Sequence, residues 1–365
     1  MDLLEKMLSC SRRWFSWTLP IVLVLAVRLP LHGYAPTLIF GVYGEGLLTA
    51  DGSGEAAVRA SGLLSWRSLL AERASLAFYA SSNLDRTVVD SQRLYDSHTL
   101  SIDALIQSPA GLLFGEGGLS GSLTGTLEGQ SPYLRPDWRI GYEGQREDLR
   151  ASVTYRGYYL NQSETSEDSL FQGLTLALEA HPSIRIRYGL EILGGWERWT
   201  EWFLYDAGGG ETDENRDDFL GSLKVSAGGL IGYFHDWSIA AEGGVRWSDA
   251  NRLTAPLPVE EGSESYLFFA VNGDWAWSPH RQVSLEVGAF ARQDLYIQRD
   301  ALTLAGTLSG VPLRVFSAGA DLRGDWTPND RLFLVLEVSA SRRFANEPGE
   351  SWWNCLGRAG IEFSF

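Results

Sequence analysis

Hydrophobic and polar residues alternate along almost all of the chain after residue 35. In residues 332–341, Leu332, Leu334, Leu336 and Val338 share one face of an extended chain. Similar runs recur at residues 184–193, 239–247 and 283–292. Each run is about 10 to 14 residues long, whereas a soluble strand averages about 5 or 6 and a tilted membrane-crossing strand needs about 9 to 11. The pattern predicts an all-β chain with strands long enough to cross a bilayer.

The connections between the expected strands alternate between short and long. Short turns are expected at residues 68–71, 108–111, 145–148, 181–183, 235–236, 278–280 and 327–330. Longer polar segments are expected at residues 50–54, 82–97, 129–135, 162–168, 197–217, 248–264, 295–311 and 343–351. Outer-membrane barrels show this alternation, with short periplasmic turns and longer extracellular loops. It predicts a closed antiparallel transmembrane β-barrel of about 16 strands, with 14 or 18 as alternatives.

The tryptophans favour a membrane barrel over a soluble sandwich or a soluble barrel, both of which would also alternate. The first group lies beside the short turns and comprises Trp66, Trp237, Trp275, Trp277 and Trp326. The second group lies near the long loops and comprises Trp138, Trp196, Trp199, Trp202, Trp247, Trp352 and Trp353. Indole rings gather at membrane interfaces, because one edge is apolar and the other is wet.

The last residues of the chain, 359–365, place Ile361, Phe363 and Phe365 on one face of a final strand. This segment resembles the C-terminal strand of Gram-negative outer-membrane β-barrel proteins. The resemblance is to the porin-like class and to no specific family. It implies a location in the bacterial outer membrane, contact with outer-membrane lipid, and recognition by the barrel-assembly machinery through Phe365.

The first 35 residues differ from the remainder. Arg12 and Arg13 precede an apolar run at residues 19–27, which is too short to span a bilayer and suits a signal peptide. A short N-terminal anchor is the alternative. Residues 1–35 are therefore expected to be a signal peptide and residues 36–365 the barrel. Because the first strand is expected soon after Pro36, no plug domain is predicted.

Composition narrows the class further. The 46 acidic residues outnumber the 30 basic ones, and the net charge of −16 argues against nucleic-acid binding. Two cysteines are too few for a disulfide framework. The mean hydropathy of −0.11 argues against a bundle of membrane helices. The sequence suggests no cofactor and no metal site.

A search for catalytic residues finds His98 as the single candidate base, near Ser97, Ser101 and Asp103. Ser101 and Asp103 are expected to face the barrel interior. A nucleophile needs a base within hydrogen-bond reach, and no G-x-S-x-G or H-E-x-x-H motif is present. The sequence therefore predicts that the chain is not an enzyme, and an outer-membrane hydrolase is the weaker alternative.

Charged residues of both signs are expected on the inner face. The predicted pore-lining residues are Arg59, Arg73, Asp103, Arg156, Arg187, Glu191, Lys224, Glu242, Arg246, Asp274, Glu286, Asp321, Arg323, Glu337 and Arg358. They would form either a hydrated channel wall or a set of salt bridges that fills the lumen. Side chains alone fill a barrel of about 8 strands. A wider lumen therefore holds water, a ligand or an inward-folded loop, for which residues 197–217 and 295–311 are candidates.

An acidic run in the predicted loop 197–217 is the last feature. Its carboxylates Glu211, Asp213, Glu214, Asp217 and Asp218 would attract cations to the pore mouth or simply keep the loop solvated. The predicted function is passive diffusion of small hydrophilic solutes or ions, with a mild cation preference. A surface adhesin-like barrel that binds a partner through its loops is the alternative. The oligomeric state stays open.

Overall fold

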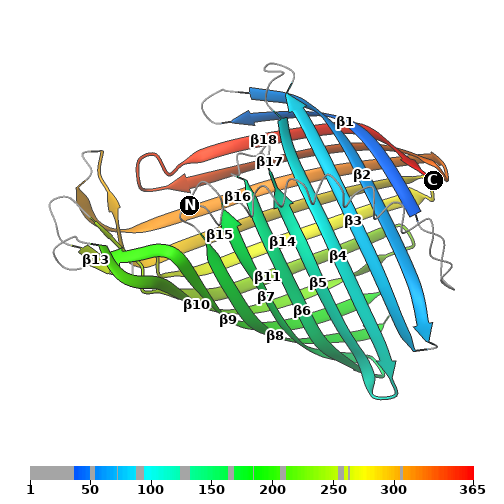
Figure 1. The fold of residues 1–365 in the computed structure, drawn as a ribbon, viewed down its shortest axis with the longest axis horizontal. Coiled ribbons are helices and arrows are strands. Elements are labelled where there is room, and N and C mark those ends of the chain that lie inside the picture. The colour runs from blue at the N-terminus through cyan, green and yellow to red at the C-terminus, as the bar shows by residue number, and fades with distance from the viewer. Residues whose placement is uncertain are drawn as a thin grey trace, which may run out of the picture.

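The computed structural model is a closed barrel of 16 antiparallel strands (Figure 1). It describes residues 37–49, 54–71, 73–87, 94–123, 132–162, 168–183, 185–205, 211–253, 259–261, 264–304 and 307–365. The predicted fold class and strand number are confirmed. The expected signal peptide, residues 1–35, lies outside the described residues. No helix in the described part of the chain is long and apolar enough to span a membrane.

Each barrel strand pairs with its neighbours in the chain, and β1 pairs with β18 to close the ring. The barrel strands are β1 (Thr37–Thr49), β2 (Gly54–Ala71), β3 (Ala74–Thr87), β4 (Leu94–Ser108), β5 (Gly111–Ser122), β6 (Tyr133–Arg146), β7 (Leu149–Gln162), β8 (Ser169–Ser183), β9 (Ile186–Tyr205), β10 (Glu211–Ile231), β11 (His235–Ser248), β14 (Tyr266–His280), β15 (Val283–Leu302), β16 (Leu308–Asn329), β17 (Leu332–Ala345) and β18 (Trp352–Ser364). The short strands β12 (Asn251–Leu253) and β13 (Val259–Glu261) form a separate hairpin between β11 and β14. Closure pairs the backbone groups that lipid could not satisfy.

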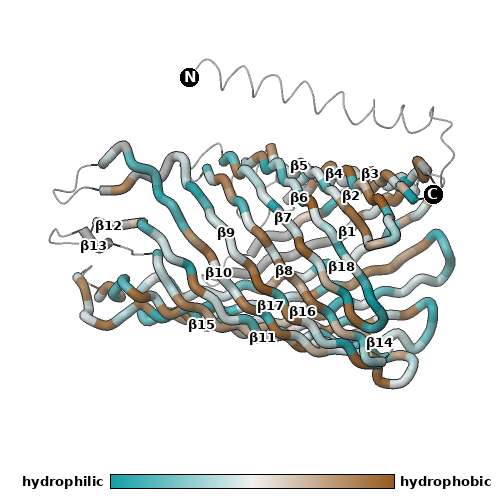
Figure 2. Tube along the Cα trace, turned by 90° about the horizontal axis from the view of Figure 1, so that it is seen from below, coloured by the Kyte–Doolittle hydropathy of each residue, from teal (hydrophilic) through white to brown (hydrophobic). Residues whose placement is uncertain are grey.

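The two faces of the wall differ in chemistry. On β10, Leu223 and Val225 are 50% and 48% exposed and point outward, while Lys224 between them points inward. Leu190 and Ile192 of β9 share the outer face. Figure 2 shows hydrophobic positions recurring along the strands around the barrel. The outer face suits lipid, because exposed aliphatic side chains cost nothing there.

Tryptophans ring the outer face at both ends of the barrel. Near the short turns lie Trp66, Trp237, Trp275, Trp277 and Trp326, and near the other end lie Trp138, Trp196, Trp247 and Trp353. Trp237 and Trp247 both lie on β11, and their separation along a tilted strand corresponds to a height of roughly 25 Å, the thickness of an outer-membrane apolar band. Trp199 and Trp352 turn instead to the inner face.

The expected long loops 82–97, 197–217 and 295–311 are wrong in length, because the strands continue through most of them. β9 and β10 run to Tyr205 and from Glu211, and β15 and β16 run to Leu302 and from Leu308. Register irregularities at Asn215 and Asp300 mark where the pairing leaves the regular barrel. The polar composition of these segments predicts loops. In the structure their polar side chains pair across strands.

The β15–β16 extension has a small hydrophobic core of its own. Leu313 is 0% exposed and Val315 is 1% exposed, and both pack with Ala301. Arg299 ties this hairpin to a neighbouring loop through an ion pair of 3.0 Å with Glu347. The extension is therefore a packed hairpin rather than a solvated loop.

Candidate pore wall and barrel rim

Strand register places every predicted pore-lining residue except Arg73 on the inner face. The inner-face residues are Arg59, Asp103, Arg156, Arg187, Glu191, Lys224, Glu242, Arg246, Asp274, Glu286, Asp321, Arg323, Glu337 and Arg358. Most of them are flanked along their strands by exposed outer-face residues, such as Leu336 and Val338 around Glu337. Period-two alternation is sufficient to predict this orientation, because each strand has a lipid-facing side.

The assignment of Arg73 to the pore wall is wrong. Ala71 pairs with Ala74, and Arg73 lies exposed in the turn between β2 and β3. The sequence pattern placed this turn at residues 68–71. The exposed Leu69 and Leu70 in fact continue the strand.

A ladder of ion pairs crosses the inner face from β16 to β18. Arg323 binds Asp325 at 2.9 Å and Glu337 at 2.9 Å, and Arg358 binds Glu337 at 2.9 Å. The Arg358 guanidinium also lies over the Tyr43 ring of β1, 5.6 Å from its centroid. The guanidinium charges in this ladder are therefore largely compensated by carboxylates.

An acidic groove of about 310 Å³ lies on the inner wall, and its carboxylates come from β11, β14, β15 and β16. Asp274 and Asp321 stand in one row on either side of Gly288, and Glu286 is the preceding inward residue. Asp321 lies over Gly288, where any side chain would collide with the Asp321 carboxylate. Among the described residues, no lysine or arginine forms an ion pair with these three carboxylates, although Ser238 donates a hydrogen bond of 3.0 Å to Asp274.

The basic residue at the groove is already paired. Arg187 makes a two-point contact with Asp236, at 2.9 and 3.3 Å. Further along the wall, Lys224 stands directly between Glu191 and Glu242 in the register. Two carboxylates therefore flank one cation at this level. Within the described residues, none of these three groups has an ion pair. The wall over β9–β16 therefore carries a local excess of negative charge.

The long-loop end of the barrel holds a buried ion-pair cluster, here called the rim cluster, made of Glu197, Arg216, Asp218 and Arg246. Asp218 is 0% exposed and accepts hydrogen bonds from Arg216 Nη2 at 2.8 Å and from Arg246 Nε at 2.8 Å. The indole N–H of Trp199 donates a third, at 3.0 Å. Two arginines around one buried carboxylate balance its charge and fill its hydrogen bonds.

Glu197 extends the rim cluster to two further strands. It accepts hydrogen bonds from Arg246 of β11 at 3.2 Å, Tyr158 of β7 at 2.8 Å and Ser169 of β8 at 3.2 Å. Glu197 is 6% exposed. The cluster therefore joins β7, β8, β9, β10 and β11 where they leave the regular barrel.

The rim cluster overturns the prediction of a solvated acidic loop. The carboxylates concerned, Glu211, Asp213, Glu214, Asp217 and Asp218, lie at the start of β10. Asp217 pairs with Arg198 at 2.7 Å and Asp218 is buried, so neither is a free mouth charge. Glu214 is exposed, and the side chains of Glu211 and Asp213 lie outside the described residues.

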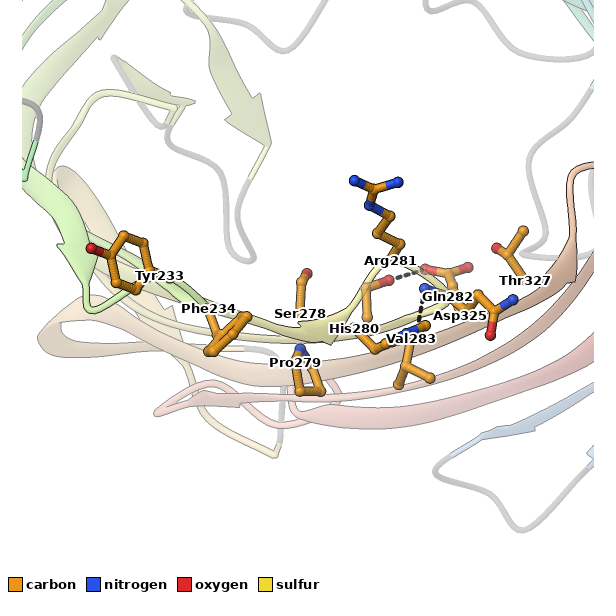
Figure 3. Close-up of a pocket in the computed structure, with 11 residues that line it drawn as sticks. Tyr233, Phe234, Ser278, Pro279, His280, Arg281, Gln282, Val283, Asp325 and Thr327 are labelled. Atoms are coloured by element: carbon orange, nitrogen blue, oxygen red, sulfur yellow. Dashed lines mark hydrogen bonds between the residues drawn. The ribbon is translucent and has the colours of Figure 1, made fainter.

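A groove of about 520 Å³ lies at the short-turn end (Figure 3). Its lining residues come from the turn after β10 and from the ends of β14, β15 and β16. The Gln282 N–H donates to His280 Nδ1 at 3.3 Å, and Ser284 donates to Asp325 at 3.4 Å. Figure 3 shows the Arg281 side chain directed away from the strands. This groove has a mixed polar and apolar lining at the short-turn end of the barrel.

The histidine considered as a catalytic base has different neighbours from those expected. His98 faces outward, whereas Ser97, Ser101 and Asp103 face inward, because adjacent residues of a strand point to opposite sides. Its Nδ1 lies 3.0 Å from Ser82 Oγ, and its Nε2 lies 2.8 Å from an Asp96 carboxylate oxygen. The i, i+2 spacing of the aspartate and the histidine was visible in the sequence. Ser82 was not, since its position depends on the pairing of β3 with β4.

A closed antiparallel barrel with a lipid-facing apolar band, tryptophan rings at both ends and a charged inner wall is an outer-membrane β-barrel protein, located in the bacterial outer membrane.

Comparison with known proteins does not assign the chain to a narrower family within this class. No family model matches the sequence, and no curated protein matches it. Among solved structures, it resembles OpdK of Pseudomonas aeruginosa determined with vanillate, with 9% identity over 90% of this chain and 99% of OpdK and a TM-score of 0.49. It also resembles OmpT of Vibrio cholerae (10% identity, 92% and 100% of the two chains, TM-score 0.48) and OmpF of Salmonella typhi in complex with daunomycin (12%, 91% and 98%, 0.45). Similarities this low carry no argument about function.

Proposed function

We propose that the barrel is a porin-like channel through which small hydrophilic solutes and ions diffuse passively, with a preference for cations. The observation that carries this proposal is the acidic groove. Among the described residues, Asp274, Glu286 and Asp321 face the lumen without forming an ion pair. Arg323 stands opposite Glu286 but is bound to Asp325 and Glu337, and Arg187 is bound to Asp236. Uncompensated carboxylates on a hydrated wall raise the local concentration of cations.

The width of the barrel supports the same proposal. Side chains fill the interior of a barrel of about 8 strands, and larger barrels enclose a cavity or an aqueous channel. Sixteen strands close this barrel, and charged residues cover its inner face. Half-exposed ion pairs such as Arg187–Asp236, whose side chains are 45% and 41% exposed, indicate a wall in contact with water.

Planar-bilayer recording tests the channel. Purified full-length protein should produce discrete conductance steps. In a KCl gradient, the sign of the reversal potential should show that K⁺ permeates more readily than Cl⁻. The triple variant Asp274→Asn, Glu286→Gln, Asp321→Asn should lower the cation-to-anion permeability ratio by about twofold or more, since it removes three negative charges from the wall.

A matched control removes three acids outside the groove. The variant Glu147→Gln, Asp148→Asn, Asp330→Asn changes residues of two short turns and should keep most of the cation preference. Absence of conductance steps at all voltages would contradict the channel, and an equal loss of selectivity in both variants would contradict the role of the groove.

A surface protein that binds a partner is the second candidate, and the β9–β10 and β15–β16 hairpins favour it. Both are packed and extend past the regular barrel. A barrel that inserts correctly yet stays silent in bilayers would support this candidate. Outer-membrane lipid and small solutes remain proposed partners. The assembly machinery is a third, through Phe365, which is 72% exposed.

A further inference from the structure

A hydrogen-bonded chain of serine, histidine and aspartate lies on the outer surface of the barrel. Ser82 of β3 and His98 of β4 are directly opposite each other in the register, with Oγ and Nδ1 3.0 Å apart. The other ring nitrogen of His98 is 2.8 Å from the Asp96 carboxylate. An ionised carboxylate requires a donor at Nε2, so Nδ1 is left as the acceptor for the Ser82 hydroxyl.

The aspartate is held firmly in place. Asp96 is 4% exposed and also accepts hydrogen bonds from the Ser122 hydroxyl at 3.2 Å and from the Leu123 N–H at 3.0 Å. These contacts come from the end of β5 and fix the carboxylate against the imidazole ring. A buried, hydrogen-bonded carboxylate that orients a histidine is the third member of a nucleophile–base–orienter set.

The hydrogen-bonded set of Ser82, His98 and Asp96 lies at the lipid interface of the outer leaflet. His98 shares its face with Leu100 and Ile102, which are 37% and 48% exposed. It lies 11 residues before the β4–β5 turn at Pro109, and Trp196 of the distal tryptophan ring lies 11 residues after the β8–β9 turn at Arg185. With the short turns on the periplasmic side, as in outer-membrane barrels generally, this level corresponds to the headgroup region of the outer leaflet.

The apolar outer face of β5, here called the strip, lies two strands from Ser82. On the outer face of β5, an added side-chain carbon at Gly115 or Gly117 would meet nothing within 4 Å. Gly117 lies between Ile102 of β4 and Trp138 of β6, four residues along the strand from the row of His98, which is roughly 13 Å. An acyl chain whose carbonyl carbon lies beside Ser82 would extend over this apolar surface, past Leu100 and Leu119.

We propose that Ser82, His98 and Asp96 form an esterase site that cleaves acyl esters of outer-leaflet lipids. Ser82 Oγ bonds to the acyl carbon, its proton moves to His98 Nδ1, and the carbonyl electron pair moves to the oxygen. Collapse breaks the bond to the alcohol oxygen, which leaves with the proton from His98. Water from the headgroup region then attacks the acyl-serine by the same route, releasing the fatty acid and restoring the Ser82 hydroxyl.

Turnover is expected to be slow. The backbone N–H groups around Ser82 are engaged, because β3 is paired with β2 on one side and with β4 on the other. A dedicated oxyanion donor is worth about 10²- to 10³-fold in rate. Covalent labelling is therefore the sensitive assay, since it requires an activated serine and a single reaction.

The test uses full-length protein folded in detergent–lipid micelles. A fluorophosphonate probe should label the wild type, with the adduct on the Ser82 peptide, and p-nitrophenyl palmitate should be hydrolysed. Ser82→Ala should abolish the label, and Ser82→Ala and His98→Asn should each lower hydrolysis at least about tenfold. Ser101→Ala, an inward serine on β4, should keep both activities, and unboiled gel migration should show that all variants are folded.

A second variant tests the substrate. Gly117→Leu should lower palmitate ester hydrolysis at least about fivefold while leaving acetate ester hydrolysis unchanged, because it fills the strip without touching the three polar side chains. Absence of labelling in folded wild type, or equal labelling in Ser82→Ala, would overturn the esterase site. Equal losses for both esters in Gly117→Leu would overturn the acyl-chain strip. Channel conductance is independent of each result.

Discussion

The rim cluster and the inner wall use the same Arg–carboxylate chemistry in different surroundings. In the rim cluster, the side chains of Arg216 and Asp218 are 4% and 0% exposed. In the wall ladder, the side chains of Arg323 and Glu337 are 43% and 29% exposed. The comparison shows that charge on this barrel has two roles, one structural where water is excluded and one electrostatic where water remains.

The difference follows from desolvation. A buried ion pair has lost its hydration, so removing one partner leaves the other uncompensated and costs about 3 to 5 kcal/mol. A hydrated pair is screened, and losing it costs at most about 1 kcal/mol. Substitutions in the rim cluster should therefore change stability more than substitutions in the wall. Substitutions in the wall should change ion selectivity more than substitutions in the rim cluster.

Removal of the buried carboxylate should have the largest effect on stability. Asp218→Ala leaves Arg216 and Arg246 without their shared partner and should lower the free energy of unfolding of the rim by about 3 kcal/mol. Limited proteolysis should then cut the β9–β10 hairpin of the folded variant, whereas the same hairpin of the wild type is expected to resist cleavage. Ser248→Ala, at the edge of the same cluster, serves as a smaller perturbation. Unchanged protease resistance in Asp218→Ala would show that the cluster does not hold the rim.

The sequence predicted the wall better than the rim for a physical reason. An inward position such as Lys224 is identified by its own neighbours, Leu223 and Val225, because lipid requires apolar residues on the other side. A rim residue such as Asp218 depends on Arg246, which is distant in sequence and reaches it only through the strand register. Without these partners, the acidic run had the composition of a solvated loop.

The hydrogen-bonded set of Ser82, His98 and Asp96 on the outer face illustrates the same limit of sequence-based prediction. Alternation showed that Ser101 and Asp103 face inward, and it also places His98 on the opposite face. The sequence could not show that Ser82 stands opposite His98, since that requires the exact pairing of β3 with β4. Spacing within one strand is therefore predictable, whereas contacts between strands need the register.

A wall substitution should have a small effect on stability and a measurable effect on selectivity. Glu337→Gln removes the shared partner of Arg323 and Arg358 and should lower the free energy of unfolding by less than about 1 kcal/mol. The loss of one wall carboxylate, with Arg323 still bound to Asp325, should lower the cation-to-anion permeability ratio about twofold at low salt, since unit charges 8 Å apart in water interact by about 0.5 kcal/mol. The shift should shrink in 1 M KCl, where the screening length is about 3 Å. A salt-independent shift would indicate a changed pore shape instead.

The smallest effect is expected where the rim cluster meets solvent. Partial burial, together with the Asp217 and Asp218 carboxylates, raises the pKa of Asp249, which follows β11 and accepts the Asp217 N–H at 2.7 Å. The folded state therefore holds this proton more tightly than the unfolded chain, so ionisation of Asp249 lowers stability as the pH rises through the raised pKa. Asp249→Asn keeps the acceptor oxygen and removes the charge. It should raise the free energy of unfolding, measured by urea titration in lipid vesicles, by less than about 1 kcal/mol at pH 7 and leave it unchanged near pH 3. A gain at pH 3 equal to that at pH 7 would mean that the repulsion around Asp249 is not what sets the stability of the rim's exposed edge.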